Sequence, residues 1–121
     1  MEMFEINDKE YELKLTLHSV KYLNKLYDGG AYALIQHALT GDIDTFIAIV
    51  HAGLFHTEEG FKLADIEKAI DKGIENEVID LDLINRTSYG VVAESFFYKK
   101  TLDKMFKHDP EAREQIEALM K

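Results

Sequence analysis

The chain has 121 residues, of which 46% are hydrophobic and 11% aromatic, so a hydrophobic core is expected rather than a disordered tail. The formal net charge of −9 argues against nucleic acid or an anionic membrane as the main partner, because both attract basic surfaces. Since cysteine is absent, disulfide frameworks, thiolate zinc sites and thiol catalysis are excluded. The length indicates one domain, residues 1–121. No apolar run approaches the ~20 residues of a membrane span, and the N-terminus lacks signal-peptide features, so we expect an intracellular protein.

The first 18 residues alternate between apolar and polar side chains. Phe4 and Ile6 share one parity before an Asn7-Asp8 turn. After the turn, one side of the chain carries Tyr11, Leu13, Leu15 and Leu17. This pattern predicts a β-hairpin within residues 1–18 with one face exposed to water. Two strands alone are marginally stable, so the apolar face must pack on the remainder of the chain.

Residues 19–121 show helical periodicity, interrupted by capping and turn residues. The expected helix starts are Ser19, Ala31, Asp42 or Asp44, a point after the loop 57–60, Asp80, and Asp109-Pro110. The helix from Asp80 is expected to run to about Lys107. The predicted fold class is therefore mainly α (α+β), with an N-terminal β-hairpin (1–18) packed on a helical body (19–121) of about five to six helices.

The expected long helix 80–107 carries an apolar stripe. Its core-facing residues should be Leu81, Ile84, Val91, Val92, Leu102, Met105 and Phe106. Leu83 and Phe97 fall on the opposite side, and Tyr89 and Phe96 on the flank. Either the helix is sandwiched between other elements, or Phe97 belongs to an exposed apolar surface. Gly90 within the helix predicts a close backbone approach.

No catalytic or metal-binding motif is apparent. His51 and His56 are five residues apart, which places them about 140° apart on a helix rather than on one face. The only local cluster that could bind a metal ion is His56 with Glu58 and Glu59. There is neither a nucleophile elbow nor a glycine-rich phosphate loop. We therefore expect no enzyme, no catalytic or metal-binding residues and no cofactor; a metal enzyme built on these histidines is a distant third possibility.

Charge is unevenly distributed along the chain. Nine acidic and three basic residues between Glu58 and Asp82 give a net charge of −6, whereas four lysines and Asp103 between Lys99 and Lys107 give +3. These segments are either ordinary solvated helix faces or the two poles of a molecule that associates head to tail. The second interpretation predicts self-association.

The order of motifs resembles a known family. The chain opens with a hairpin over residues 4–14, followed by a helix that ends in Tyr27 and glycines, and then by a Gly41-Asp42 helix start. An acidic helix around Asp65-Ile66-Glu67 precedes a C-terminal part that contains Glu94-Ser95-Phe96-Phe97. Over nearly its whole length the sequence resembles the small tail assembly chaperones encoded by long-tailed phages and prophages of Gram-positive bacteria.

The resemblance implies a non-enzymatic chaperone of the bacterial host cytoplasm that is absent from the mature virion. Its expected partners are the tape measure protein, which it would keep soluble, and the tail tube protein, reached through a longer frameshifted form. The resemblance also implies that Phe96-Phe97 is a candidate interaction surface. With neighbouring residues, the candidate partner-binding set is Tyr89, Phe96, Phe97, Lys100 and Lys104.

The alternative is a small acidic inhibitor or immunity-type protein that masks a basic site on one globular target. The acidic helix around 65–77 would then form the binding surface. An inhibitor should be a monomer that forms a salt-sensitive one-to-one complex, whereas a tail chaperone should self-associate.

Overall fold

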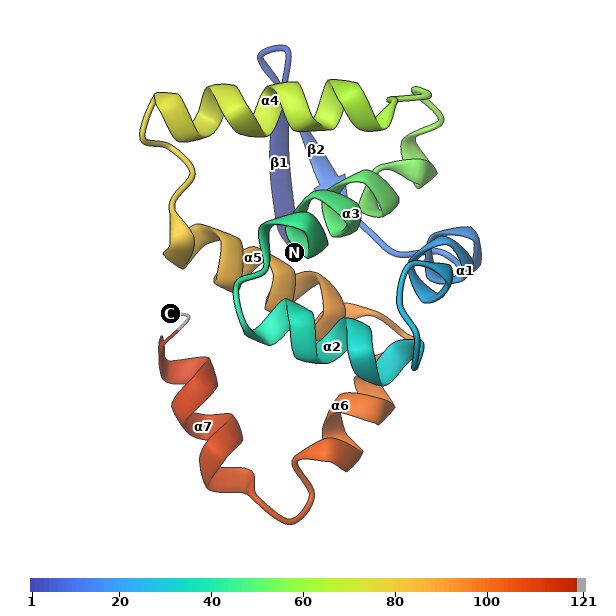
Figure 1. Cartoon of the computed structure of the whole chain (residues 1–121), viewed down its shortest axis with the longest axis vertical. Helices are drawn as coiled ribbons and strands as arrows, with labels where there is room; N and C mark the ends of the chain where they lie inside the picture. Colours follow the sequence, from blue (N-terminus) through green and yellow to red (C-terminus); the bar gives the residue numbers. More distant parts are fainter. Residues whose placement is uncertain (120–121) are drawn as a thin grey trace.

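The computed structural model describes residues 1–119. A hairpin of β1 (Glu2–Ile6) and β2 (Lys9–Leu13) precedes a set of helices. These helices are α1 (Leu17–Lys25), α2 (Ala31–Leu39), α3 (Ile43–Gly53), the 3₁₀ turn η1 (Phe55–Thr57), α4 (Leu63–Glu75), α5 (Leu81–Glu94), α6 (Lys99–Met105) and α7 (Pro110–Leu119). Helix α4 lies at one end of the molecule, and α6 and α7 lie at the other (Figure 1). The predicted fold class, a hairpin on a helical body, is confirmed.

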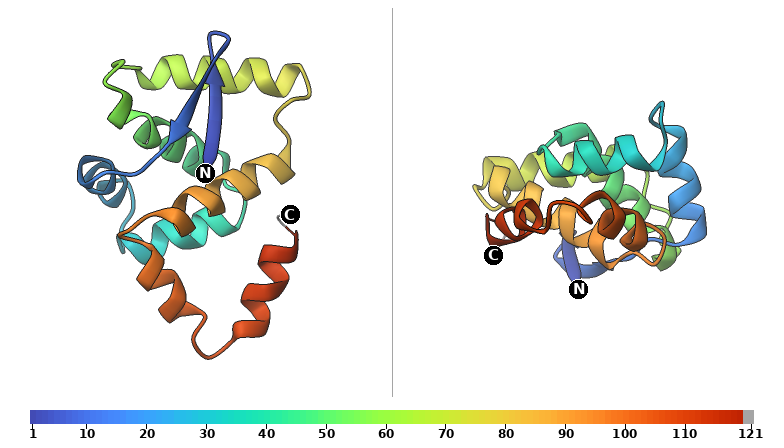
Figure 2. Two further views of the ribbon diagram at one scale, coloured as in Figure 1. Left: turned by 180° about the vertical axis from the view of Figure 1, so that it is seen from behind. Right: turned by 90° about the horizontal axis from the view of Figure 1, so that it is seen from below.

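The hairpin has the alternation that the sequence predicted. Asn7 (φ 51°) and Asp8 (φ 65°) both take left-handed conformations, as a two-residue type I′ turn requires. Phe4, Ile6 and Leu13 are buried, and Met3 and Glu5 are exposed between them. Seen from behind, the hairpin lies over α3 and α4 (Figure 2), so its apolar face packs on the helical body.

The second strand is shorter than expected. It ends at Leu13, after which the Lys14 N–H donates to the Gly53 carbonyl at 3.0 Å. Leu17 was expected on the apolar face of the strand but is an exposed residue at the start of α1. Thr16, not Ser19, is the N-cap: its hydroxyl accepts from the Ser19 N–H, and the Ser19 hydroxyl accepts from the Thr16 N–H. This reciprocal capping box turns the chain into a helix before the strand pattern is complete.

Helix α3 is central to the core. Phe46, Ile49 and Val50 on this helix are fully buried, and the helix contacts α1, α2, α4 and α5 as well as β2. The predicted cap Asp42 accepts a hydrogen bond from the Thr45 N–H at 3.1 Å. Two further predicted caps behave in the same way, with Asp80 accepting from the Leu83 N–H and Asp109 from the Ala112 N–H. The three aspartates were thus reliable signals of where these helices begin.

The prediction of one long helix over residues 80–107 is wrong, because the helix ends at Glu94 and a new helix, α6, begins at Lys99. Ser95 adopts an extended conformation (ψ 130°), and its hydroxyl accepts from the Phe97 N–H at 3.3 Å. Tyr98 is fully buried, and its hydroxyl donates to Asn24 of α1 at 3.0 Å. A serine side chain that bonds a nearby backbone N–H competes with the hydrogen bonds of the helix. Burial of Tyr98 against α1 stabilises the bend.

The break alters the predicted apolar stripe. Ile84, Val91, Val92 and Leu102 are buried as expected, and Met105 and Phe106 pack partly against the core. Leu81 was expected in the core but is exposed. Leu83 was expected on the side of the helix facing away from the core, but it packs partly against the core. Because Thr87, Ser88 and Tyr89 are buried too, α5 is enclosed on several sides.

Gly90 is approached closely by the Glu2 side chain rather than by a neighbouring backbone. A Cβ added there would lie 2.6 Å from Glu2 Cδ. Glu2 reaches this position because it shares a strand face with Phe4 and Ile6. Burial, and next the charge of Glu94, raise the pKa of the Glu2 carboxyl, while the α-amino group and Arg86 act in the opposite direction.

Replacing Glu2 with glutamine should raise the melting temperature at neutral pH. A carboxyl whose pKa is higher in the folded state binds its proton more tightly there, so its ionised form costs stability at neutral pH, and this cost disappears as the pH falls through the folded pKa. The benefit of Glu2→Gln should therefore shrink on acidification. Thermal melts of both proteins across the acidic to neutral range, with exposed Glu114→Gln as the control, measure this. An advantage that grows at low pH would contradict the assignment.

Among the described residues, no single helix is long and apolar enough to cross a membrane. The segments Ala31–Leu39 and Ile43–Thr57 are together long and apolar enough, but they are bent by 116° relative to each other.

Candidate functional site: two apolar surfaces

The turn between α5 and α6 presents two adjacent aromatic side chains to solvent. Phe96 is 67% exposed and Phe97 is 42% exposed, whereas Tyr98 is fully buried. The Phe97 and Tyr98 rings meet edge to face with centroids 5.1 Å apart. Burial raises the pKa of Tyr98 to about 12. Because Tyr98 anchors the turn to α1 through Asn24, the two phenylalanines extend from a supported backbone rather than from a loose loop.

The five candidate partner-binding residues do not form one exposed surface. Lys100 and Lys104 lie exposed on α6, directly after the phenylalanine turn. Tyr89 is buried instead, and its hydroxyl donates to Glu117 of α7 at 2.9 Å. Arg113 of α7 also bonds Glu117, and pairs with Asp103 of α6. The helical wheel placed Tyr89 on a flank, but could not show that a later helix packs over that flank.

A second surface lies between α1, α3 and α4, which the sequence analysis did not identify. It is a groove of about 320 Å³ lined by Tyr22, Leu26, Tyr27, Asp44, Ile47, Ala48, Leu63 and Glu67. Leu26 and Leu63 remain 47% and 40% exposed. Residues from three helices form it, so no single segment of sequence carries its pattern.

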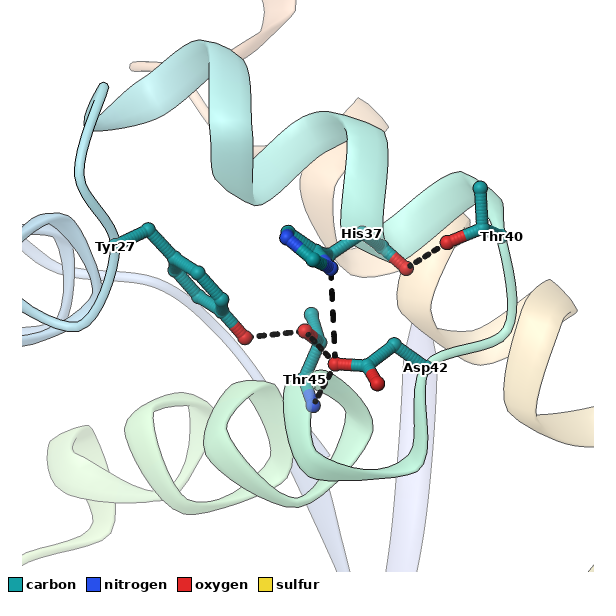
Figure 3. A network of polar contacts seen from close by, with 5 residues as sticks. All are labelled: Tyr27, His37, Thr40, Asp42 and Thr45. Atoms are coloured by element: carbon teal, nitrogen blue, oxygen red, sulfur yellow. Dashed lines mark hydrogen bonds and ion pairs between the residues drawn. The ribbon is translucent and has the colours of Figure 1, made fainter.

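A polar network holds one wall of this groove (Figure 3). The Thr45 hydroxyl donates to Asp42 Oδ2 at 2.6 Å, so it accepts from the Tyr27 hydroxyl. The His37 ring stacks on Tyr27 with centroids 4.8 Å apart, and its Nδ1 lies 3.9 Å from Asp42 Oδ2. This Tyr-Thr-Asp chain caps α3 and ties α1 to it, so we interpret it as structural rather than catalytic.

A histidine holds the other tyrosine of the groove. His51 Nε2 lies 3.1 Å from the Phe61 carbonyl oxygen, which can only accept, so in the neutral ring this nitrogen carries the proton. Its Nδ1 then accepts from the Tyr22 hydroxyl at 3.3 Å. Burial raises the pKa of Tyr22. Both groove tyrosines thus have their hydroxyl groups bonded within the protein.

His56, the histidine of the sequence cluster with Glu58 and Glu59, bonds a strand instead. His56 Nε2 lies 2.6 Å from the Glu12 carbonyl oxygen, which ties η1 to β2. A pocket of about 200 Å³ beside it is lined by His18, His51, Leu54, Phe55, Glu58, Gly60 and Phe61, smaller than the ~300–1,000 Å³ usual for ligand sites. Within residues 1–119, no group of three or more histidine, aspartate or glutamate side chains is placed to hold a metal ion.

The two oppositely charged segments lie at opposite ends of the molecule. The acidic segment 58–82 includes α4, and the lysine-rich segment 99–107 includes α6 (Figure 1). Helix α7 lies at the same end as α6 and carries Glu111, Glu114 and Glu117 against Arg113, so acidic side chains accompany the lysine-rich segment there.

Comparison with known proteins identifies the family. Neither the curated proteins nor the solved structures yield a significant match. A family model described as phage tail assembly chaperone protein, TAC, matches residues 3–107. The match covers the hairpin, helices α1 to α6 and the phenylalanine turn. The chain therefore belongs to the phage tail assembly chaperone family.

Proposed function

We propose that this protein binds the tape measure protein in the host cytoplasm and keeps it soluble during tail assembly, without enzymatic activity and without entering the mature virion. A longer frameshifted form would add the contact that recruits tail tube subunits. Membership of the chaperone family supports the general role. The observation that carries the proposal is the pair of exposed phenylalanines held on an anchored turn.

Exposed aromatic side chains suit an apolar client. Phe96 and Phe97 present apolar area between exposed Glu94 on one side and exposed Lys99 and Lys100 on the other. A phenylalanine that becomes fully buried on binding contributes ~1.5–3 kcal/mol. One such contact is weak, but many copies along one elongated client bind far more tightly than a single copy. The net charge of −9 would keep such a coated client in solution.

Self-association is part of the proposal. The acidic segment 58–82 and the lysine-rich segment 99–107 carry opposite charge, and a head-to-tail contact between them would build rings or open spirals. Self-association would supply the multivalency that a long client requires. Raised salt should weaken it, because the contacts are between exposed charges.

Phe97→Asp should abolish or strongly reduce solubilisation of the tape measure protein while costing less than ~1 kcal/mol of stability, because the substitution is at the surface. The measurement is the fraction of tape measure protein in the soluble lysate on co-expression, with urea unfolding of the purified chaperone variant. Tyr32→Asp, on another exposed aromatic residue, is the matched control and should leave solubilisation unchanged. Equal loss with both variants, or an early-melting Phe97→Asp protein, would contradict a specific role for the phenylalanine turn.

The alternative class, an acidic inhibitor that masks a basic site, rests on the acidic α4. It predicts a monomer that binds one globular partner in a salt-sensitive one-to-one complex and has no effect on the tape measure protein. Sedimentation of the purified chain at low and high salt, together with the co-expression assay, separates the two classes.

A further inference from the structure

We infer that the groove between α1, α3 and α4 binds an amphipathic helix that carries basic residues beside its apolar face. The inference rests on the proposed chaperone function in taking a helical segment of the client as the natural occupant. It adds a second binding surface, distinct from the phenylalanine turn, and specifies the chemistry of what fits there.

The floor of the groove is apolar and accessible. Leu26, Ile47, Ala48 and Leu63 supply the aliphatic surface, and Leu26 and Leu63 are each at least two-fifths exposed. The volume of about 320 Å³ falls at the lower end of the range for ligand sites, ~300–1,000 Å³. This space accommodates a few large apolar side chains rather than a whole folded domain.

The charge of the groove is of one sign. Among the described lining residues, only Asp44 on α3 and Glu67 on α4 carry charge, and both are exposed carboxylates. They come from two different helices, so each can meet a cation beside the apolar face of an occupant. Lysine or arginine at these positions gives complementary pairs, whereas an acidic occupant is repelled.

The walls of the groove are already ordered. The Tyr27 hydroxyl is bonded to Thr45, and the Tyr22 hydroxyl to His51, so neither ring needs to be immobilised when an occupant binds. Binding to an ordered surface loses less side-chain entropy than binding to a mobile one. A surface held in this way by internal hydrogen bonds fits a recognition site better than an incidental depression does.

The chemistry of the lining favours a helix over an extended peptide. The tyrosine hydroxyls are engaged within the protein, and the other polar side chains of the lining are carboxylates, which only accept hydrogen bonds. An extended segment would leave its carbonyl groups without side-chain donors, whereas a helix satisfies its own backbone. Helix-in-groove binding also matches a site built from helices, which offers no strand edge.

The test uses the full chain and two synthetic 14-residue peptides. One has leucines on one helical face and lysines on the other; its counterpart replaces every lysine with glutamate. Isothermal titration should show that the lysine peptide binds the wild-type chain at least about tenfold more tightly than the glutamate peptide, a difference of about 1.4 kcal/mol. Equal binding of the two peptides would overturn the proposed charge preference.

Matched variants separate the groove from general attraction to an acidic protein. Asp44→Asn with Glu67→Gln should weaken the lysine peptide about tenfold, whereas Asp71→Asn with Glu75→Gln, the same charge change on the exposed surface of α4, should change its affinity less than twofold. Leu26→Gln with Leu63→Gln should also weaken binding, and Val78→Gln with Leu81→Gln, two exposed apolar residues elsewhere, should not. Equal effects of groove and control variants would refute the site.

Two further results distinguish this inference from the proposed function. If the Leu26→Gln with Leu63→Gln variant still solubilises the tape measure protein while Phe97→Asp does not, the groove is not a client site and the chaperone function stands. If the wild-type chain fails to solubilise the tape measure protein, the chaperone function fails, and the peptide titrations still decide what the groove binds. Self-association that is lost in the groove variant without added peptide would assign the groove to a second copy and overturn the inference.

Discussion

Tyr98→Ala will lower the free energy of unfolding by about 3–5 kcal/mol, the usual cost of truncating a large buried aromatic residue. Tyr98 is fully buried between α5 and α6, and its hydroxyl bonds Asn24 of α1. The substitution removes packing from the core and leaves the Asn24 side-chain oxygen without this donor. Because the bend that exposes Phe96 and Phe97 depends on this anchor, client binding should fall together with stability.

The neighbouring residue provides the control. Phe97→Ala, one position earlier and 42% exposed, should cost less than ~1 kcal/mol. Tyr98→Phe keeps the ring and removes only the hydrogen bond, so it should cost ~1–3 kcal/mol. Urea unfolding of the three variants, followed by far-UV circular dichroism, measures these differences. A Tyr98→Ala protein as stable as Phe97→Ala would show that the turn is not anchored as described.

Ile49→Ala should lower the free energy of unfolding by about 2–5 kcal/mol, because it leaves a cavity in the most connected helix of the core. Ile49 is fully buried on α3, which packs against four other helices. Leu23→Ala on α1, also fully buried, should cost a similar amount. Each helix carries its own control: Ile43 on α3 is 48% exposed, and Leu26 after α1 is 47% exposed.

The paired controls make the comparison independent of residue type. Ile43→Ala and Leu26→Ala remove the same atoms from the surface and should each cost less than ~1 kcal/mol. Chemical denaturation gives the four values, and an unchanged dependence of the free energy on denaturant shows that compactness is preserved. Equal costs at positions 43 and 49 would contradict the assigned orientation of α3.

Helix starts were the most predictable part of the fold. Asp42, Asp80 and Asp109 each accept a hydrogen bond from a backbone N–H three residues later, which is a local interaction between neighbours in the sequence. The Asn7-Asp8 turn is equally local. By contrast, Thr16 and Ser19 formed one shared cap, and considering Ser19 alone shifted the predicted helix start.

The break at residues 95–98 was the main error, and its cause is not local. The segment contains neither proline nor glycine, and a helical wheel continued through it predicts Phe97 opposite the core. The bend is stabilised by burial of Tyr98 against α1, a contact across 74 positions of sequence. For the same reason the wheel could not place Tyr89, which α7 covers through Glu117.

The groove was inaccessible to sequence reasoning. Its apolar residues come from three separate segments, with Leu26 directly after α1, Ile47 on α3 and Leu63 on α4. Each helix separately shows only an ordinary amphipathic pattern. In a chain with 23 acidic residues, nothing in the sequence distinguishes Asp44 and Glu67 from the other carboxylates. Their meaning depends on where the helices pack.

The sequence by itself determined the hairpin, the caps of α3, α5 and α7, the acidic and lysine-rich segments and the likeness to tail assembly chaperones, because these depend on residues that are close along the chain or on composition. Only the tertiary structure decided which apolar residues remain exposed. Phe96 and Phe97 lie outside because Tyr98 lies inside, and Leu26 and Leu63 border a groove because α1 and α4 both pack on α3. Exposure is a property of long-range packing, which periodicity within one segment cannot specify.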